Sequence, residues 1–193
     1  NKAIDWIGSQ EKPWFMWLAY NAPHTPFHIP PTNMHSQGAL PEYRAGLDAV
    51  PYYFAAIEAM DTEIGRLLWA MTDAELSNTI ILYIGDNGTP GRVVDRSVYG
   101  SGSKGSLMEG GLRVPMVVSG AGVSRQNVRE SALINSSDFF ATIANLAGSS
   151  VTAVEDSQSF KGLLSNAGSA QRDYVYSDFE GDSVSGWAVR GRQ

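Results

Sequence analysis

The sequence predicts an α/β fold in which a mainly parallel sheet is sandwiched by helices. Three short apolar runs, residues 14–20, 80–84 and 114–119, lack the alternation of half-exposed strands and are typical of strands buried on both faces. Two stretches, 50–71 and 138–146, carry apolar residues at three- and four-residue steps, which predicts amphipathic helices. Strands that alternate with helices at this spacing favour α/β layers.

Composition limits the classes of function. The chain has 193 residues, 43% hydrophobic and 18% charged, which is enough for one sizeable core. Its net charge of -6 gives no basic footprint and argues against a nucleic-acid partner. No apolar run reaches membrane-spanning length. The absence of cysteine excludes disulfides, thiolate metal sites and cysteine nucleophiles from this stretch.

The first part of the chain predicts a helix, a strand and a stiff loop. Residues 1–10 form a helical pattern that the Lys12-Pro13 break ends. The strand at 14–20 leads into a proline-rich loop, where His24 lies between Pro23 and Pro26. Because proline fixes φ and restricts the preceding residue, this loop is a good mount for a functional side chain.

The histidines of this region have ordinary alternatives. For His24, the alternative is a loop imidazole that is bonded to a nearby backbone group. His28 and His35 are expected to be surface or loop histidines.

The helix predicted at 50–71 is the clearest in the chain. Its apolar stripe consists of Val50, Tyr53, Phe54, Ile57, Met60, Ile64, Leu67, Leu68 and Met71. Its charged residues, among them Glu58 and Arg66, are expected to face solvent. Residues 73–78 are expected to be a short loop.

The strand predicted at Ile80–Ile84 ends abruptly at Gly85-Asp86-Asn87-Gly88. In open α/β sheets, ligands bind outside the carboxyl ends of the strands. Asp86 and Asn87 offer a carboxylate and an amide oxygen, the ligand types that Ca²⁺ or Mg²⁺ takes. The alternative is a turn, because Asp-Asn-Gly is a strong turn former whose side chains bond their own backbone.

The remaining elements follow a polar loop that carries Lys104. The sequence predicts a strand at 114–119, a helix at 138–146 capped by Ser137 or Asp138, and late strands at 174–177 and 187–190. Residues 148–170 are low in hydrophobic content and are expected to be exposed. We expect residues 1–150 to belong to one α/β domain, and 151–193 to form a connection and the start of a C-terminal subdomain.

Several catalytic motifs are absent. Gly100-x-Gly102-x-x-Gly105 fits a dinucleotide motif formally, but it follows a charged loop and lacks the acidic residue expected about twenty positions later. It is not a Walker A loop, and neither Gly-x-Ser-x-Gly nor His-Glu-x-x-His occurs.

Three motifs in one chain order resemble the sulfatase family of the alkaline phosphatase superfamily. They are Asn21-Ala-Pro-His24-Thr-Pro26, Asp86-Asn87-Gly88 and Lys104-Gly-Ser-Leu-Met-Glu-Gly-Gly-Leu-Arg-Val-Pro115. The stretches 59–65 and 137–143 are similar to that family as well. The resemblance runs from about residue 13 to 148 and resumes weakly at 174–190.

The resemblance implies a type I, arylsulfatase-like enzyme that hydrolyses sulfate monoesters with a formylglycine nucleophile. In that family a Ca²⁺ ion, with Mg²⁺ the less favoured metal, is held by two upstream aspartates and an Asp-Asn pair, which maps onto Asp86 and Asn87. The sulfate-binding histidine maps onto His24 and the sulfate-binding lysine onto Lys104. At about 4 Å and an effective dielectric near 20, a lysine attracts a sulfate oxygen by roughly 4 kcal/mol before desolvation. His24 could bind sulfate or give a proton to the departing alcohol.

The chain departs from the family pattern in one respect. It has no Cys- or Ser-x-Pro-x-Arg motif and no upstream aspartate pair. We therefore expect a fragment that is truncated at both ends, inactive alone and able to bind Ca²⁺ only weakly.

Two other functions stay open, a phosphodiesterase or phosphonate hydrolase of the same superfamily and a non-catalytic relative. The expected partner is a small-molecule or carbohydrate sulfate ester. The resemblance implies a periplasmic or extracellular location.

Overall fold

The computed structural model describes residues 2–151, 154–167, 172–181 and 185–192. The chain divides into two compact units, Asn1–Asn78 and Thr79–Gln193, which we describe separately. The domain boundary expected between residues 150 and 151 falls inside the second unit and stays a prediction.

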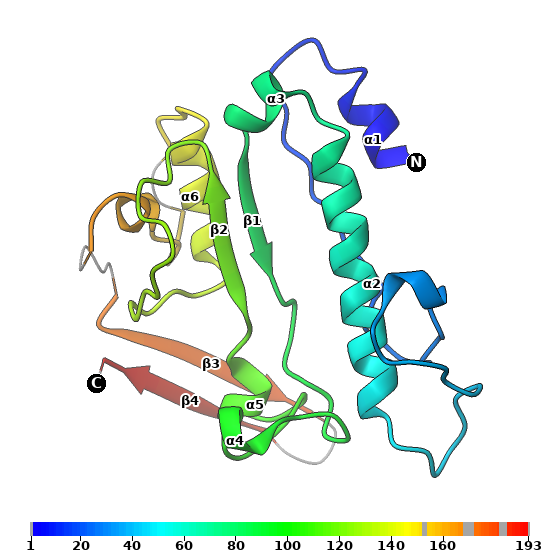
Figure 1. Cartoon of the computed structure of the whole chain (residues 1–193). Coiled ribbons are helices and arrows are strands. Elements are labelled where there is room, and N and C mark those ends of the chain that lie inside the picture. The colour runs from blue at the N-terminus through cyan, green and yellow to red at the C-terminus, as the bar shows by residue number, and fades with distance from the viewer. Residues whose placement is uncertain (1, 152–153, 168–171, 182–184, 193) are drawn as a thin grey trace. The chain divides into compact units, whose positions relative to one another are not determined.

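The first unit is built on one long helix. Its elements are α1 (Lys2–Ile7), the 3-10 helix η1 (Thr32–Met34), α2 (Val50–Trp69) and α3 (Asp73–Ser77) (Figure 1). The helix predicted at 50–71 is confirmed, and Pro51 lies in its first turn, where a missing N–H costs nothing. The buried apolar residues of this unit are Ile7, Phe27, Ala49, Tyr52, Ala55 and Met60.

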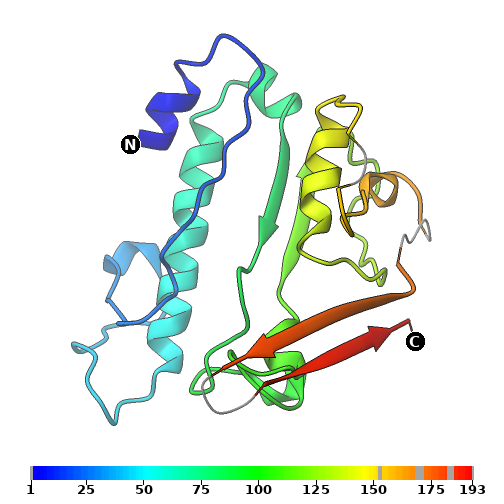
Figure 2. The same cartoon turned by 180° about the vertical axis from the view of Figure 1, so that it is seen from behind.

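The strand predicted at residues 14–20 is wrong. The segment runs along α2 without strand structure (Figure 2), and the side chains of Phe15 and Trp17 are 59% and 80% exposed. An apolar run gives the tendency to form a strand, but a strand also needs a partner to accept its backbone hydrogen bonds. Within the described part of the chain, this segment pairs with no other strand.

A short helix, α3, replaces the loop predicted at 73–78. The backbone N–H of Glu75 donates to Thr72 Oγ1 at 3.2 Å, and the N–H of Thr72 donates to Glu75 Oε2 at 2.7 Å. This is a capping box, in which two otherwise unpaired N–H groups are satisfied reciprocally.

In its described residues, the second unit contains two sheets of two strands each. One joins β1 (Ile80–Ile84) to β2 (Met116–Gly120), and the other joins β3 (Tyr174–Glu180) to β4 (Ser185–Gly191) (Figure 1). The strands predicted at 80–84, 174–177 and 187–190 are therefore confirmed, and the one predicted at 114–119 begins two residues later.

Both strand pairs are antiparallel, which corrects the parallel pairing predicted for this region. In the first pair, Ile80 lies opposite Gly120 and Ile84 opposite Met116. An unbroken apolar run indicates burial but does not fix the direction of the neighbouring strand. The direction follows from the connection, which here returns through two four-residue helices, α4 (Arg96–Tyr99) and α5 (Glu109–Leu112).

Helix α6 (Asp138–Leu146) has the predicted bounds, and the segment after it, predicted to be exposed, is exposed only in part. In the 3-10 helix η2 (Lys161–Leu164), Leu163 and Leu164 are buried, as is the preceding Phe160. Phe160 packs edge-on against Phe139 of α6, with ring centroids 5.4 Å apart. A few apolar residues among many polar ones suffice to cover a helix. Residues 152–153 and 168–170 of the predicted segment lie outside the described residues.

Asp138 is the centre of a buried polar network and does not cap α6. Ser137 holds the N-cap position, and its side chain makes no capping hydrogen bond, so the predicted cap is wrong. Its carboxylate accepts the N–H of Asn135 and of Gln158, each at 2.8 Å. It also pairs with both Nε and Nη2 of Arg172, just before β3. These hydrogen bonds raise the pKa of the Arg172 guanidinium, against the lowering effect of its burial.

None of the helices in the described ranges is long and apolar enough to cross a membrane.

Candidate functional site

The Asp86-Asn87 pair lies directly beyond β1. The N–H of Gly85 donates to the carbonyl of Pro115 at 3.0 Å, which extends the β1–β2 pairing by one residue. The chain then bends, and both Asp86 and Asn87 are exposed. Asn87 Nδ2 donates to Asp86 Oδ2 at 2.6 Å, so the two side chains lie together. The alternative was a turn whose side chains bond their own backbone. The chain does bend here, but the bond joins the two side chains to each other, so a carboxylate and an amide lie at one exposed point.

Thr89 joins this bend to the segment that carries Lys104. Its N–H donates to the carbonyl of Gly110 at 3.1 Å, and its carbonyl accepts the N–H of Lys104 at 2.8 Å. Gly88 allows the close approach, because a Cβ there would collide with the backbone of Gly110 and Gly111. The structure therefore links the backbone of Lys104 through Thr89 to the bend that carries Asp86 and Asn87.

The Lys104 loop, residues 100–108, has its own internal order. Ser106 Oγ donates to the carbonyl of Ser103 at 2.7 Å and accepts the N–H of Ser103 at 3.2 Å. Gly102 adopts a φ of 82°, which favours glycine, and a Cβ there would meet the side chain of Met108. Lys104 itself is exposed. A fixed backbone that carries an exposed lysine can present an ammonium group to an anion from solvent.

His24 lies in the first unit, on an exposed turn. Its backbone N–H donates to the carbonyl of Asn21 at 2.8 Å, and its Nδ1 lies 2.7 Å from the carbonyl oxygen of Thr25. A carbonyl oxygen can only accept, so Nδ1 carries the proton of this hydrogen bond. The backbone-bonded imidazole considered as an alternative is thus present. Since the bond occupies Nδ1, a ligand would meet Nε2.

Aromatic rings anchor the His24 loop to α2. The ring of Phe27 packs edge-on against Tyr43 with centroids 5.0 Å apart, and Tyr43 packs edge-on against Tyr52 at 4.9 Å. Tyr52 Oη donates to the carbonyl of Pro41 at 2.7 Å. The loop is therefore fixed to α2 through the buried Phe27, three residues after the histidine, and through Tyr43 and Tyr52.

The other two histidines, His28 and His35, are not among the predicted site residues. His28 is exposed, as expected. His35 Nδ1 accepts the N–H of Gln37 at 3.3 Å. Glu58, expected to face solvent only, accepts hydrogen bonds from the backbone of Ser36 and the side chain of Gln37, which lower the pKa of its carboxyl. These contacts tie the 35–37 segment to α2.

Two contacts of the site region were missed by sequence reasoning. One is the pairing of Thr89 with Gly110 and Lys104, which uses backbone atoms only and leaves no side-chain signature. The other is an ion pair between Arg190 of β4 and Glu109 of α5. These two residues are 81 positions apart, so no periodicity could have joined them.

Asp86 and Asn87 offer the ligand types that a hard cation prefers, but too few ligands to hold it alone. In the ranges that the structure describes, no three His, Cys, Asp or Glu residues gather closely enough to hold a metal ion. Ca²⁺ takes about six to eight oxygen ligands, so Asp86 and Asn87 would supply a minority of them.

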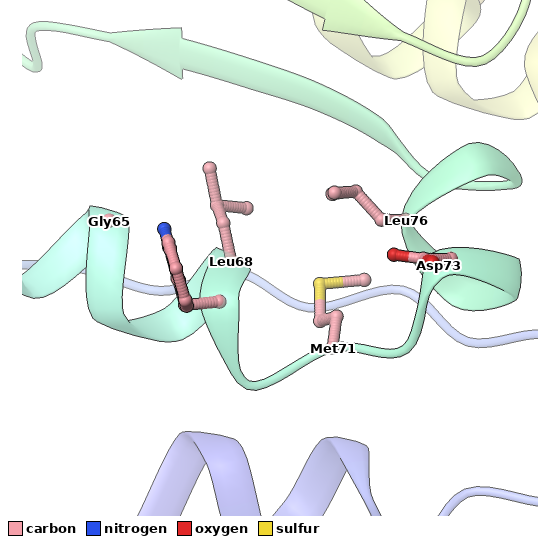
Figure 3. Close-up of a pocket in the computed structure, with 6 residues that line it drawn as sticks. Gly65, Leu68, Met71, Asp73 and Leu76 are labelled. Atoms are coloured by element: carbon pink, nitrogen blue, oxygen red, sulfur yellow. The ribbon is translucent and has the colours of Figure 1, made fainter.

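A hollow elsewhere in the first unit contains none of the predicted site residues. It lies between the last turns of α2 and α3 and is lined by Gly65, Leu68, Trp69, Met71, Asp73 and Leu76 (Figure 3). The lining is mostly apolar, and it offers one carboxylate. The lining contains neither an Asp-Asn pair nor a lysine.

Known proteins place the chain in a family. The model of the sulfatase family matches residues 1–149. The uncharacterised sulfatase YdeN of Escherichia coli K12 is 28% identical over 153 residues, which cover 77% of this chain and 26% of that protein. An arylsulfatase of Clostridium perfringens is 24% identical over 213 residues, with 92% of this chain and 43% of that protein covered.

A solved structure shows the same fold. BT4656, in complex with its substrate D-glucosamine-2-N,6-O-disulfate, superposes with a TM-score of 0.62 at 25% identity, over 74% of this chain and 30% of that one. The chain thus spans between about a quarter and less than half of the length of the proteins that it matches. Since the family model matches well over half of it, the chain belongs to the sulfatase family.

Proposed function

We propose that this chain is part of a type I sulfatase, a sulfuric ester hydrolase that cleaves sulfate monoesters. The observation that carries the proposal is the hydrogen-bonded pairing of Thr89 with Lys104, which brings a lysine segment beside the Asp86-Asn87 bend in a member of the sulfatase family. In this proposal residues 1–150 belong to the catalytic domain, and 151–193 lead into a C-terminal subdomain.

Asp86 and Asn87 would hold Ca²⁺ together with ligands from elsewhere in the complete protein. Their side chains lie together and are exposed, and both offer the oxygen atoms that hard cations prefer. When bound, the metal would polarise the sulfuryl oxygens, and a formylglycine outside this segment would supply the nucleophile.

Lys104 would bind the sulfuryl group as a positive point charge. During hydrolysis the S–O bond to the alcohol breaks and a new S–O bond forms, while negative charge spreads over the sulfuryl and leaving oxygens. A lysine that is held close to those oxygens stabilises this charge. The backbone bond between Lys104 and Thr89 favours a constant position for that ammonium group.

His24 would act through Nε2, either on a sulfuryl oxygen or on the oxygen of the departing alcohol. The hydrogen bond from Nδ1 to Thr25 fixes the ring orientation, as is common for histidines that transfer protons. A protonated Nε2 can donate to the sulfate or give its proton to the leaving group.

The substrate class that we propose is a small-molecule or carbohydrate sulfate ester. The structural neighbour BT4656 has a sulfated sugar as its substrate, which supports a carbohydrate among the candidates. By resemblance to the family, we also propose a periplasmic or extracellular location.

The test is steady-state hydrolysis of matched sulfate and phosphate esters by the complete protein and its Lys104→Ala variant. We expect the sulfate ester to be the better substrate, and we expect Lys104→Ala to lower kcat/KM for it by roughly 10²–10³-fold, as loss of a charge-stabilising group does. Lys161→Ala is the matched control, because Lys161 is exposed and its Nζ donates to the carbonyl of Asn145, in the last turn of α6.

Three results would count against the proposal. Near-normal turnover by the Lys104→Ala variant would show that Lys104 does not stabilise the charge on the sulfuryl group. Faster hydrolysis of the phosphate ester would favour a phosphodiesterase or phosphonate hydrolase. If the complete protein hydrolysed neither ester, the result would favour a non-catalytic relative.

A further inference from the structure

We propose that Arg190 is a positioning residue of the sulfatase site, which fixes the Lys104 loop through Glu109. The inference rests on the proposed function and gives the β3–β4 hairpin a part in it. Nη1 of Arg190, on β4, donates to Oε1 of Glu109, the first residue of α5. The ion pair therefore joins the late hairpin to the helix that follows the Lys104 loop directly.

A short series of backbone bonds leads from Glu109 to Lys104. Gly110, the next residue, accepts the N–H of Thr89, and the carbonyl of Thr89 accepts the N–H of Lys104. A shift at the start of α5 would therefore move the backbone of the candidate sulfate-binding lysine.

A second observation places one face of β4 close to this segment. A Cβ built on Gly186 would lie 3.4 Å from Cδ1 of Leu107, in the Lys104 loop. Gly186 and Arg190 lie on the same face of the strand, with the small Ala188 between them. Four residues of a strand span roughly 13 Å, so β4 approaches the segment at two separate points. Figures 1 and 2 both show β4 beside α5.

The ion pair is too exposed to act mainly as a stabilising contact. The side chains of Arg190 and Glu109 are 45% and 42% exposed, and Arg113 lies 3.7 Å from the same carboxylate. Surface pairs of this kind contribute little to the free energy of folding. Loss of Arg190 should therefore change the position of the loop more than the stability of the fold.

The kinetic test uses the complete enzyme, with Arg190→Gln examined alone and in the Lys104→Ala background. We expect Arg190→Gln to lower kcat/KM for a sulfate ester roughly tenfold, because small misplacements of a catalytic group are costly. In the Lys104→Ala background it should cause almost no further loss, since the two residues act as a unit. Arg190→Lys, which keeps a charge near Glu109, should restore most of the activity.

Arg192→Gln is the matched control. Arg192 belongs to the same hairpin and pairs with Asp173 at 3.3 Å, at the other end of the strand from Gly186. This variant should leave kcat/KM within about twofold of the parent, as is usual for surface substitutions. Equal losses from Arg190→Gln in both backgrounds, or the same kinetics in Arg190→Gln and Arg192→Gln, would overturn the proposal.

Hydrogen exchange separates failure of this inference from failure of the proposed function. The amide of Lys104 is bonded to Thr89, and we expect it to exchange faster in Arg190→Gln than in Arg192→Gln. This result would support the positioning contact even if the protein hydrolysed no sulfate ester. Equal exchange in the two variants would overturn the contact whatever the activity.

Discussion

At the scale of single residues, backbone bends and local hydrogen bonds set the positions of a few polar side chains. Asp86 and Asn87 are exposed because the chain bends immediately after β1, and their side chains bond one another. His24 bonds Thr25 through Nδ1, so its other ring nitrogen is the one that a substrate would meet. The local hydrogen bonds engage Nδ1 of His24 and Oδ2 of Asp86, so a ligand would meet Nε2 of His24 and the Oδ1 atoms of Asp86 and Asn87.

We expect His24→Ala to lower kcat/KM of the complete enzyme by roughly 10²–10⁴-fold, the range typical of a positioned proton donor. His28→Ala is the control, since His28 is exposed in the same proline-rich segment. Steady-state kinetics with sulfate esters of good and poor leaving groups would distinguish the two possible roles.

If His24 protonates the leaving oxygen, the loss should shrink when the departing alcohol is strongly acidic. If it binds the sulfuryl group, the loss should be similar for all esters. A His24→Ala variant as active as His28→Ala would exclude both roles.

At the scale of elements, Asp138 and Arg172 fasten α6 to the start of β3. Their side chains are 3% and 10% exposed, and the pair is bidentate. We expect Asp138→Asn to lower the free energy of unfolding by roughly 3–5 kcal/mol, because it leaves a buried guanidinium without its counter-charge. Denaturant unfolding measures this directly.

The control is Glu63→Gln on α2. Glu63 pairs with Arg66, whose side chain is 55% exposed, and loss of such a surface pair costs about 1 kcal/mol or less. Equal costs for the two variants would show that the buried pair adds nothing beyond a surface contact.

Elements defined by local pattern were predictable from the sequence. Helices α2 and α6 follow from their apolar steps, and β1 follows from an apolar run that ends in Gly-Asp-Asn-Gly. Helix α3 was missed although Thr72 and Glu75 have the capping-box spacing, so that signal was available.

Features that depend on distant partners were not predictable. The run at 14–20 has strand-like residues, but pairing decides whether a strand forms, and the antiparallel direction of β2 depends on its connection to β1. The candidate site was found from motifs and their resemblance to a family. Its contacts through Thr89 and Arg190 join segments that no local pattern relates.

At the scale of the whole molecule, the residues with proposed roles belong to different compact units. His24 belongs to residues 1–78, whereas Asp86, Asn87 and Lys104 belong to residues 79–193. The proposed hydrolysis also requires further metal ligands and a nucleophile, because Asp86 and Asn87 supply only part of a Ca²⁺ shell.

The most direct test is a crystal structure of the complete protein with Ca²⁺ and inorganic sulfate. Our account predicts a cation on the oxygens of Asp86 and Asn87, and one sulfate ion within hydrogen-bonding distance of both Lys104 Nζ and His24 Nε2. A sulfate bound elsewhere, or one that contacts Lys104 while His24 faces away from it, would contradict the proposed site.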